Sequence, residues 1–498
     1  MLYQSTRGDA QRLSGAEAIV RGLSNDGGLF VPESVPDISN ETIQELVSKP
    51  YYERAAYIMG LFLSDFSNEE LTRYSRTAYS EPGFDHAAIA PLYKIDNATH
   101  FMELWHGATC AFKDIALQVM PHLLTASLRK TGENRDVCIL VATSGDTGKA
   151  ALEGFRDVPG IKIMVFYPQD GVSEVQKLQM ITQRGDNVNV AGIPGNFDDA
   201  QTGVKSIFSD KKLNARLDSG GYILSSANSI NWGRLVPQVA YYFSAYCDLL
   251  GNGEIKPGEK INFCVPTGNF GNILAAFYAR RMGLPIAKLI CASNRNDVLS
   301  QFINTGVYDR KRKFFTTVSP SMDILVSSNL ERLLFELSDK DGGAVASYMS
   351  ALSDDGRYEV PTGVHENIKE IFASGFCSEE DTLETIADTF NDSGYLTDTH
   401  TAVAYKALKD YRRATGDRSA AVVVSTASAF KFCESVLEAL GRPYSAGGVS
   451  LIDTLSAVTG SPIPAPLAGL GSLTPRFPGS IGAHDMKSAV TDFLLQSD

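Results

Sequence analysis

The feature that most constrains the fold of this chain is a repeated alternation of short apolar runs with helical stretches. Residues 137–142, VCILVA, contain no polar side chain, so they predict a strand that is covered on both faces. Similar runs recur between loops and helical patterns at residues 161–167, 187–191, 261–266, 288–292 and 420–424. Strands that alternate with helices build parallel sheets with helices on both faces, so the sequence predicts an α/β fold.

The length of 498 residues predicts more than one folding unit, because single hydrophobic cores split beyond about 250–300 residues. Residues 1–92 carry mainly helical patterns and no evident chemistry, so we expect an N-terminal packing or lid domain. Residues 93–498 form the α/β region, with a smaller subdomain over about 135–215 and a larger one in the remainder. Residues 460–482 are rich in Pro and Gly and predict an extended surface segment, followed by a last helix over 485–495.

Composition excludes several classes of partner. The net charge of −13 argues against a nucleic-acid surface. The 7 cysteines are scattered without a CxxC pair, which favours buried free thiols in a reducing compartment over disulfides or a metal site. There is no apolar run of about 18 residues and no secretory signal pattern. We therefore expect a cytoplasmic protein that binds neither metal, membrane nor nucleic acid.

One lysine marks a candidate reactive centre. Lys113 follows Phe112 and precedes an apolar helical pattern over residues 115–124, so we expect it at a loop-to-helix junction. Burial beside an apolar residue disfavours the charged ammonium and makes the amine a better nucleophile. Such amines form Schiff bases with aldehydes, and pyridoxal phosphate (PLP) is the aldehyde that enzymes use most widely. A surface lysine at a helix start would fit the same local pattern, so the remaining segments have to decide.

Four segments could bind a ligand beside this lysine: residues 143–148, 267–272 and 425–429, which follow predicted strands, and residues 226–234, an asparagine-rich turn beside an arginine. In open α/β sheets, ligands lie beyond the carboxyl ends of the strands, where loop amides and the positive end of a helix dipole attract anions. Each segment, taken alone, is also an ordinary helix start.

The four segments differ in the chemistry that they offer. The two glycines of TGNFGN, residues 267–272, would let consecutive amides cup a phosphate, although the run is neither a Walker A loop nor GxGxxG. TSGDTG, residues 143–148, offers hydroxyls and amides, but Asp146 opposes an anion unless it faces away or caps the helix. Arg234 could bind a phosphate bidentately, and the hydroxyls of residues 425–429 could bond a cofactor nitrogen.

Together these segments resemble the threonine synthases, PLP enzymes of fold type II (the tryptophan-synthase-β-like fold). The resemblance spans nearly the whole chain and is carried by STRG, SNDGGLFVP, HGATCAFKD, ATSGDTG, NSINWGR, PTGNFGN, SPSMDI, SSNLER, DTHTAV and STASAFKF. HGATCAFKD and PTGNFGN, in this order and at this separation, are its most specific part. The resemblance implies two open parallel-sheet α/β domains plus an N-terminal threonine-synthase domain. The layout is similar to the longer form of the family, found in fungi and many bacteria.

The resemblance also implies how the cofactor is held. Lys113 would bind PLP covalently and, once freed, would move protons as the catalytic residue. The cofactor, and chiefly its phosphate, would be bound by four residues of one loop: Gly268, Asn269, Phe270 and Asn272. Thr426 would hydrogen-bond the pyridine nitrogen. A hydroxyl at that place leaves the nitrogen less firmly protonated than a carboxylate would, which suits chemistry at Cβ and Cγ better than transamination.

The implied reaction converts O-phospho-L-homoserine and water to L-threonine and phosphate. Ser144, Asp146 and Thr147 would lie around the substrate's carboxylate, and Asn231 and Arg234 would bind its phosphate. Two alternatives stay open: a PLP lyase that releases 2-oxobutanoate, phosphate and ammonia, and a PLP-binding regulatory protein without turnover. A plain nucleotide-binding protein is disfavoured, because neither nucleotide fingerprint is present. The single-chain layout of the family implies a monomer.

Two places depart from the family pattern. Ala108 stands where the family usually has proline, so we expect a less rigid turn before the lysine. Ser428-Ala429-Phe430 replaces the more usual His-Pro-Ala or Ser-Pro-Tyr, which keeps Thr426 but alters its loop. His400 lies in a family-like segment, and we interpret it as structural.

Overall fold

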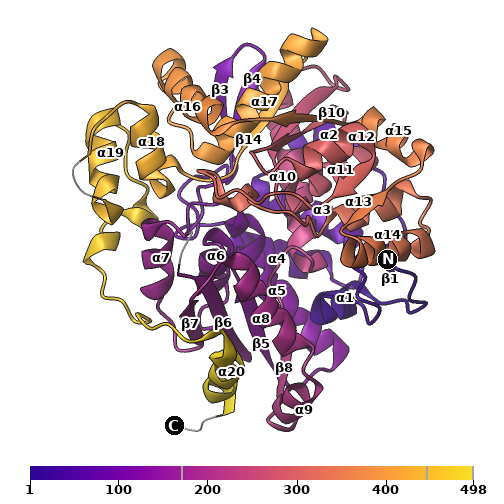
Figure 1. Cartoon of the computed structure of the whole chain (residues 1–498). Helices are drawn as coiled ribbons and strands as arrows, with labels where there is room; N and C mark the ends of the chain where they lie inside the picture. Colours follow the sequence, from indigo (N-terminus) through magenta and orange to yellow (C-terminus); the bar gives the residue numbers. More distant parts are fainter. Residues whose placement is uncertain (170–171, 445–446, 496–498) are drawn as a thin grey trace.

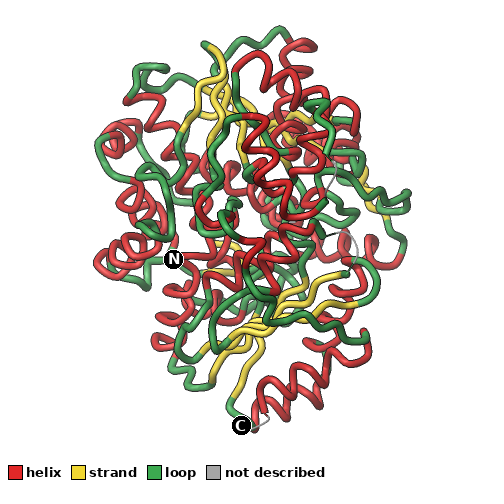
Figure 2. The backbone as a smooth tube through the Cα atoms, turned by 90° about the vertical axis from the view of Figure 1, so that its left-hand side faces the viewer, coloured by secondary structure: helices red, strands yellow, loops and turns green. Residues whose placement is uncertain are grey.

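Two separate sheets organise the molecule, as shown by a computed structural model that describes residues 1–169, 172–444 and 447–495. Figure 2 shows the two groups of strands toward opposite ends of the molecule, with helices and loops between them. Both sheets are built from buried strands that alternate with helices, so the predicted α/β class is confirmed. The sheets differ in size and in the parts of the chain that supply them.

The larger sheet has six strands in the order β13-β10-β9-β14-β4-β3. Its strands are β3 (Leu92–Asp96), β4 (Thr99–Glu103), β9 (Ile261–Pro266), β10 (Ile286–Ser293), β13 (Phe372–Phe376) and β14 (Ala421–Ser425). All neighbouring strands are parallel except β3, which pairs antiparallel with β4 at one edge. The order brings β14, from late in the chain, between β9 and β4, so the loops after these three strands meet at one edge.

The smaller sheet has four parallel strands in the order β7-β6-β5-β8. They are β5 (Asp136–Ala142), β6 (Ile161–Pro168), β7 (Val188–Ile193) and β8 (Tyr222–Ser225). The border near residue 215 that the sequence predicts for this subdomain is therefore too early, because β8 pairs in register with β5. β8 is short and only partly buried, so its sequence lacks the continuous apolar run that marks the other strands.

Two long buried helices join the sheets. α5 (Lys113–Thr131) leads from the larger sheet to β5, and α10 (Trp232–Gly251) leads from β8 back to β9. The remaining helices of the α/β region are α6 (Asp146–Gly154), α7 (Glu174–Ile181), α8 (Phe197–Phe208), α9 (Lys211–Ser219), α11 (Gly271–Arg281), α12 (Val298–Thr305), α13 (Leu330–Leu337), α14 (Gly342–Asp354), α15 (Thr362–Ile371), α16 (Glu379–Ser393), α17 (Thr399–Thr415), α18 (Cys433–Ala439), α19 (Leu451–Thr459) and α20 (Met486–Leu495). A short hairpin of β11 (Val307–Asp309) and β12 (Arg357–Glu359) lies apart from both sheets.

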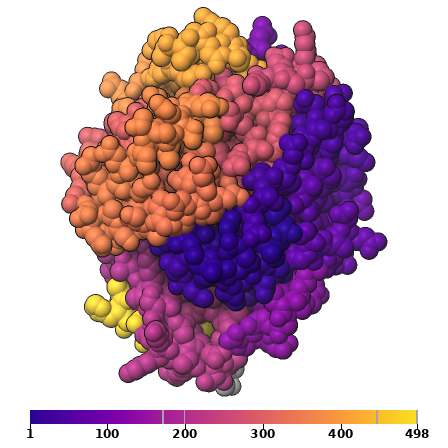
Figure 3. All heavy atoms as spheres, turned by 90° about the vertical axis from the view of Figure 1, so that its right-hand side faces the viewer, coloured from indigo at the N-terminus to yellow at the C-terminus, as the bar shows by residue number. Residues whose placement is uncertain are grey.

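The N-terminal region is mainly helical, as predicted. Its elements are β1 (Tyr3–Ser5), α1 (Gly15–Arg21), β2 (Phe30–Pro32), α2 (Asn40–Val47), α3 (Tyr51–Phe62) and α4 (Asn68–Ala78). Ser14 and Ser67 each close a capping box that satisfies free amides at a helix start. In the space-filling view, these indigo and violet residues lie against later parts of the chain (Figure 3). The Arg332 guanidinium donates to the Phe30 carbonyl over 2.9 Å and helps to hold the two regions together.

The C-terminal part of the chain returns to the smaller sheet. Residues 460–482 form an extended segment with short 3-10 turns, which confirms the predicted surface wrap. Figure 1 shows this yellow segment passing α7 on its way to α20. Met486, Val490 and Leu494 of α20 are buried in one apolar cluster with residues of β5, β6 and α8. The subdomain built around the smaller sheet is thus completed by residues from the far end of the chain.

Several predictions need correction or limits. The sequence of residues 430–440 predicts a helix, but the helix begins at Cys433, because Ala429–Lys431 form a 3-10 turn that carries Lys431 inward. The sequence of residues 171–184 also predicts a helix; it is α7, and residue 171 lies outside the described residues. Four strands were not predicted, because β3, β8 and β13 are partly exposed and polar residues interrupt β4.

Two general properties concern the cysteines and the helices. All seven cysteines lie in the described ranges as buried free thiols, in agreement with the prediction. Among the described helices, none combines the length and apolarity needed to cross a bilayer.

Candidate functional site

Backbone pairing places Lys113 beside the loop that follows β14. The Phe112 amide donates to the Thr426 carbonyl over 2.8 Å, and the Ser428 amide donates to the Cys110 carbonyl over 3.1 Å. These bonds hold the loop before α5 against the loop after β14. Lys113 is the first residue of α5, at the junction predicted from the sequence, and its ammonium nitrogen lies 4.5 Å from the centre of the Phe112 ring.

A buried carboxylate lies between Lys113 and a second lysine. Asp146 Oδ2 is 3.2 Å from Lys113 Nζ, and Asp146 Oδ1 is 2.6 Å from Lys431 Nζ. Gln176 Nε2 donates to Asp146 Oδ1 over 2.7 Å. Lys431 is fully buried and also donates to the Thr109 carbonyl over 2.9 Å. One carboxylate therefore ties the start of α6 to both lysine-bearing segments.

This charge arrangement shifts the proton affinities of the pair. Burial lowers the pKa of Lys113, Arg234 and Lys431 lower it further through their positive charge, and the Asp146 carboxylate only partly opposes them. Burial alone would raise the pKa of Asp146, but the charges of Lys431 and Lys113 dominate and hold it below its usual value. Lys113 is thus an amine with a weakened hold on its proton, next to a permanent anion.

The turn before Lys113 is fixed by its neighbour Asp114. Asp114 Oδ2 accepts from the Thr109 amide over 2.8 Å, and Asp114 Oδ1 accepts from the Thr109 hydroxyl over 2.7 Å. A side chain at Gly107 would place its Cβ 2.4 Å from Asp114 Cβ, so this close approach requires glycine. Burial raises the pKa of Asp114 to about 6. Ala108, which replaces the usual proline, lies half-buried inside a turn that these bonds already hold.

The loop between β9 and α11 presents free amides. Phe270 precedes α11 in the left-handed conformation with φ of 62° and makes no side-chain cap, so the first amides of the helix lack that partner. A Cβ at Gly268 would lie 2.5 Å from the Ser321 carbonyl oxygen, which leaves space only for glycine. The exposed Asn269 is held through its carbonyl, which accepts from the Asn329 side chain over 3.0 Å.

Asn272 supplies a polar atom without a partner at the same place. Its Oδ1 accepts from the Tyr241 hydroxyl over 2.5 Å and from the Tyr242 hydroxyl over 2.6 Å, which orients the amide. Its Nδ2 is buried, and within the described ranges it has no hydrogen-bond partner. An unbonded buried donor is costly, so this atom indicates a missing acceptor.

Thr426 offers a free hydroxyl at the end of β14. Thr426 is only 5% exposed, and its backbone carbonyl is occupied by Phe112. No side-chain or backbone group in the described part of the chain is bonded to its hydroxyl. The altered residues that follow, beginning with Ser428, keep this geometry because Ser428 is bonded to Cys110 through its backbone.

The third loop, between β5 and α6, brings Ser144 and Thr147 toward the same region. Thr143 Oγ1 accepts from the amides of Gly145 over 3.0 Å and Gly148 over 2.8 Å, which fixes the turn. Ser144 and Thr147 are half-buried on either side of Asp146. For this loop to be a simple anion site, Asp146 would have to face away or act as the N-cap. It does neither, because its carboxylate faces Lys113.

Arg234 and Asn231, at the start of α10, differ in their surroundings. Arg234 is 5% exposed, donates to the Ala227 carbonyl over 2.7 Å and has no carboxylate partner in the described ranges. Burial lowers the pKa of Arg234 to about 10. Asn231 is fully buried and caps α10, accepting from the Gly233 amide, while its Nδ2 donates to the Ile19 carbonyl. The structure thus places Asn231 as a link to the N-terminal domain and leaves Arg234 as a cation without an anion.

Comparisons with known proteins identify the family. Residues 2–79 match the family model of the threonine synthase N terminus, and residues 86–354 match that of the pyridoxal-phosphate dependent enzymes. Threonine synthase of Pseudomonas aeruginosa is 42% identical over 440 residues, which cover 88% of this chain and 90% of that protein. The chain belongs to the threonine synthase family.

Other members of the threonine synthase family extend the comparison. The solved structure of PLP-bound threonine synthase from Brucella melitensis superposes with a TM-score of 0.88 at 36% identity and covers 100% of both chains. Human threonine synthase-like 1 is 43% identical over 436 residues, 85% of this chain, and the match spans 58% of that longer protein. The fold predicted from the sequence, PLP fold type II with an N-terminal threonine-synthase domain, is confirmed.

The described residues fit the cofactor of this family, pyridoxal phosphate. Lys113 supplies a buried amine with a lowered pKa, and Asn272 Nδ2 and the amides at the start of α11 are donors suited to a phosphate. The free hydroxyl of Thr426 lies at the end of the strand next to β9, beside the lysine loop. These groups come from three separate segments, and the strand order of the larger sheet brings them to one edge.

Sequence reasoning missed the residues that hold the lysine in place. Lys431, Gln176 and Thr109 were not singled out, although Lys431 lies within the quoted STASAFKF segment. Lys431 and Gln176 contact Asp146 from distant parts of the chain, so no local spacing signals these contacts; Thr109 bonds the nearby Asp114, but an ordinary turn would have the same spacing. His400 agrees with its structural interpretation, since its Nε2 accepts from the Ser321 amide over 3.1 Å and its Nδ1 lies 3.0 Å from Asp398 Oδ1.

Proposed function

We propose that this chain is a threonine synthase, which converts O-phospho-L-homoserine and water to L-threonine and phosphate with PLP. The observation that carries the proposal is the buried lysine Lys113, whose pKa is lowered by burial and which is held by Asp146 beside the unbonded hydroxyl of Thr426. Membership of the threonine synthase family supports the choice of substrate.

In this proposal, the residues of the cofactor site have distinct tasks. Lys113 holds PLP covalently through Nζ, and Thr426 donates its hydroxyl to the pyridine nitrogen or accepts from it. The cofactor phosphate is bound by the amides of one loop and by Asn272 Nδ2: Gly268, Asn269, Phe270 and Asn272. PLP, when bound, supplies an electron sink for the bond that breaks at Cα of the substrate.

The substrate is held by groups on the opposite loops. Ser144 and Thr147 offer hydroxyls, and the first turn of α6 offers amides, to the substrate's carboxylate. Asp146 belongs to this loop but takes part by positioning Lys113, because a carboxylate does not attract another carboxylate. Arg234 binds the substrate's phosphate as a charge-assisted donor, and Asn231 positions it by capping α10.

Proton transfer falls to Lys113. The freed Lys113 amine would lie next to Cα of the substrate and would take the proton from that atom. Burial lowers the pKa of Lys113, which makes the amine a better proton acceptor than an exposed lysine would be. Phosphate leaves from Cγ, water adds its hydroxyl at Cβ, and protons are returned to the carbon skeleton, so L-threonine and phosphate account for all atoms of substrate and water.

The decisive experiment measures three products at once. The purified protein is incubated with PLP and O-phospho-L-homoserine, and phosphate, L-threonine and 2-oxobutanoate are assayed together. We expect phosphate and threonine in equal amounts, both abolished in Lys113→Ala. Phosphate with 2-oxobutanoate would instead assign the chain to the elimination lyases. An absorbance band of lysine-bound PLP without any phosphate release would favour a regulatory PLP-binding protein.

Two further properties belong to the same proposal. The protein acts as a monomer, as the single-chain layout of the family implies; light scattering coupled to size-exclusion chromatography would test this. It acts in the cytoplasm, a location that suits seven buried free thiols. Fractionation of cells that produce the protein would test the location.

A further inference from the structure

A second cavity lies behind the turn that precedes Lys113. It has a volume of about 270 Å³ and is bounded by α6, the end of α7 and the extended C-terminal segment. The C-terminal segment contributes Pro466, Leu470 and Leu473, and the lysine turn contributes Ala108. The cavity does not include Lys113 or Asp146 among its lining residues, so it is separate from the proposed cofactor site.

The polar side of this cavity carries an excess of positive charge. Lys149 and Arg156 pair with Glu153, at 3.0 Å and 2.6 Å, so the carboxylate is already shared by two cations. Arg184 also lines the cavity, and no described residue offers it a carboxylate. Arg476 lies beside it and donates only to backbone carbonyls, over 3.0 Å to Gln183 and 3.1 Å to Gly185. In a chain with a net charge of −13, this local surplus favours an anionic group.

The same cavity contains a buried acceptor without a partner. Gln179 lines the cavity and is 2% exposed, and its Nε2 reaches the Thr109 carbonyl over 3.5 Å. Its Oε1 is buried, and within the described ranges nothing donates to it. An amide flip does not help, because Nε2 would then lose the carbonyl that it faces. The cavity therefore offers an acceptor for an N–H or O–H group, next to cations for an anion.

We propose that this cavity binds an aliphatic α-amino acid. The carboxylate would pair with the Arg184 guanidinium, the ammonium would donate to Gln179 Oε1, and the aliphatic side chain would pack against Ala108, Leu470 and Leu473. The three kinds of lining group correspond to the three parts of such a ligand. A plain phosphate ion would leave the apolar wall unused, and a simple hydrocarbon would leave both polar features unsatisfied.

The cavity is connected to the reactive lysine through Thr109. Gln179 faces the Thr109 carbonyl, to which Lys431 also donates, while the Thr109 amide and hydroxyl hold Asp114. A ligand that engages Gln179 and Ala108 therefore acts on the turn that positions Lys113. We infer that occupancy changes the rate of the enzyme, which makes the cavity an effector site.

Calorimetric titration of the PLP-loaded protein with L-valine tests binding. L-valine is an aliphatic amino acid that is neither the proposed substrate nor the proposed product, so the result does not depend on the proposed function. We expect saturable binding at one site. Arg184→Gln and Gln179→Leu should each weaken it about tenfold or more, since each removes one polar contact to a charged group. Arg184 is exposed at the surface, so its variant should keep the thermal stability of the parent protein.

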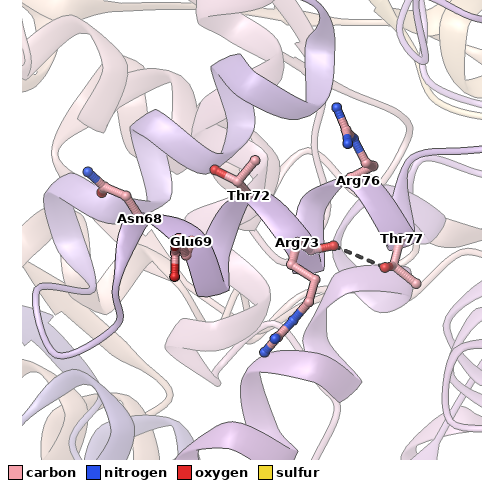
Figure 4. Close-up of a pocket in the computed structure, with 6 residues that line it drawn as sticks. All are labelled: Asn68, Glu69, Thr72, Arg73, Arg76 and Thr77. Atoms are coloured by element: carbon pink, nitrogen blue, oxygen red, sulfur yellow. Dashed lines mark hydrogen bonds between the residues drawn. The ribbon is translucent and has the colours of Figure 1, made fainter.

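A matched control comes from a hollow elsewhere. α4 lines a surface hollow of about 430 Å³ that carries Arg73 and Arg76 but has no unpartnered buried polar atom among its lining residues. All six lining residues belong to α4, and Figure 4 shows their labelled side chains spread along this one helix. Arg73→Gln should leave L-valine binding unchanged. Absence of saturable binding, or equal binding in Arg184→Gln and the parent protein, would overturn the proposal.

A second measurement tests the connection to the site. Saturating L-valine should change the rate of phosphate release from O-phospho-L-homoserine by about fivefold or more, and the change should vanish in Arg184→Gln. Binding without any rate change would overturn the effector role. If the parent protein released no phosphate at all, the proposed function would fail while the calorimetric result on the cavity would stand.

Discussion

The Asp146 carboxylate is shared by two buried lysines, and this makes it the residue on which the site depends most. Lys113 and Lys431 approach its two oxygen atoms separately, and Gln176 adds a third bond. Two cations around one anion leave a net positive charge in a dry environment. Burial and the positive charges of Arg234 and Lys431 lower the pKa of Lys113, and the Asp146 carboxylate only partly opposes them. The ion cluster therefore tunes the amine and fixes its place at the same time.

Replacing Lys431 should destabilise the protein strongly. In Lys431→Met, the buried Asp146 carboxylate loses its closest cation. Breaking a buried ion pair by removing one partner lowers the free energy of unfolding by about 3–5 kcal/mol. Urea denaturation would measure the loss. Lys130→Met is the matched control, because the Lys130–Glu70 pair is partly exposed and its loss should cost at most about 1 kcal/mol. Equal costs for both variants would contradict the role given to Lys431.

The buried Asp114 carboxyl predicts a pH dependence of stability. Burial raises the pKa of Asp114 to about 6 in the folded protein, whereas an unfolded aspartate has a pKa of about 3.9. Between these values the folded state binds more protons, so the contribution of Asp114 to the free energy of unfolding falls as pH rises, by up to about 3 kcal/mol. As the pH rises from about 4 to about 6, the free energy of unfolding of Asp114→Asn should therefore increase relative to that of the parent protein. A stability difference that stays constant over this range would contradict the prediction.

At the residue scale, the sequence predicted the reactive lysine but not its supports. Lys113 was predicted because a local pattern, an apolar neighbour and a helix start, surrounds it. Lys431 and Gln176 act through Asp146, which lies far from both of them along the chain. No local sequence pattern therefore indicates these contacts. Contacts of this kind depend on the strand order, which composition and spacing do not encode. The assignment of Arg234 and Thr426 to the substrate and the cofactor stays a prediction.

At the scale of elements, the loop between β9 and α11 is held rigidly for its task. The Gly268 carbonyl accepts from Ser327 Oγ over 2.8 Å, and its α-carbon leaves no room for a side chain. The segment opposite is fixed in turn, since the Ser321 amide donates to His400. Contacts within the chain therefore hold the direction of the free amides of α11, which is preorganisation in the physical sense.

Gly268→Ala should weaken cofactor binding. The added methyl group would lie 2.5 Å from the Ser321 carbonyl oxygen, so the loop has to shift and its amides lose their alignment. We expect the dissociation constant for PLP to rise about tenfold or more. The absorbance of the lysine-bound cofactor would measure this change. Gly363→Ala in α15 is the control, because its added methyl group meets no atom within 4 Å. PLP affinity unchanged in Gly268→Ala would show that the loop does not bind the cofactor.

The sequence predicted six of the ten strands in the two sheets, because those six carry nearly continuous apolar runs. β3, β8 and β13 were missed because they are partly exposed, and β4 was missed because polar residues interrupt its apolar run. The antiparallel pairing of β3 with β4 could not be predicted either, because the alternation of strands and helices indicates parallel sheets. The insertion of β14 between β9 and β4 is a long-range choice of the whole chain, and it is the choice that assembles the site.

At the scale of the whole molecule, α20 packs with a sheet whose strands lie far earlier in the sequence. Leu494 lies in the apolar cluster shared by β5, β6 and α8, and Lys487 pairs with Asp210 at the start of α9 over 2.7 Å. Lys162 of β6 donates to the Phe493 carbonyl over 3.2 Å. The C-terminal helix is therefore an integral part of the smaller subdomain.

Leu494→Ala should loosen the smaller sheet selectively. Removing most of a buried leucine side chain costs about 2–5 kcal/mol, and the loss should appear as faster amide hydrogen exchange in β5, β6 and α8. The larger sheet should keep its protection. Leu23→Ala is the control, because Leu23 is 42% exposed and its loss should cost at most about 0.5 kcal/mol. Uniform acceleration of exchange in both sheets would contradict a local role for α20.

The position of α20 has a consequence for synthesis on the ribosome. The strands of the smaller sheet leave the exit tunnel early, but the apolar cluster on one of its faces stays incomplete until Met486 and the residues after it have been made. During that interval the nascent chain exposes apolar surface of the kind that makes incompletely folded chains prone to aggregation. A chain truncated before α20 should therefore leave the apolar residues of this cluster exposed on the smaller sheet.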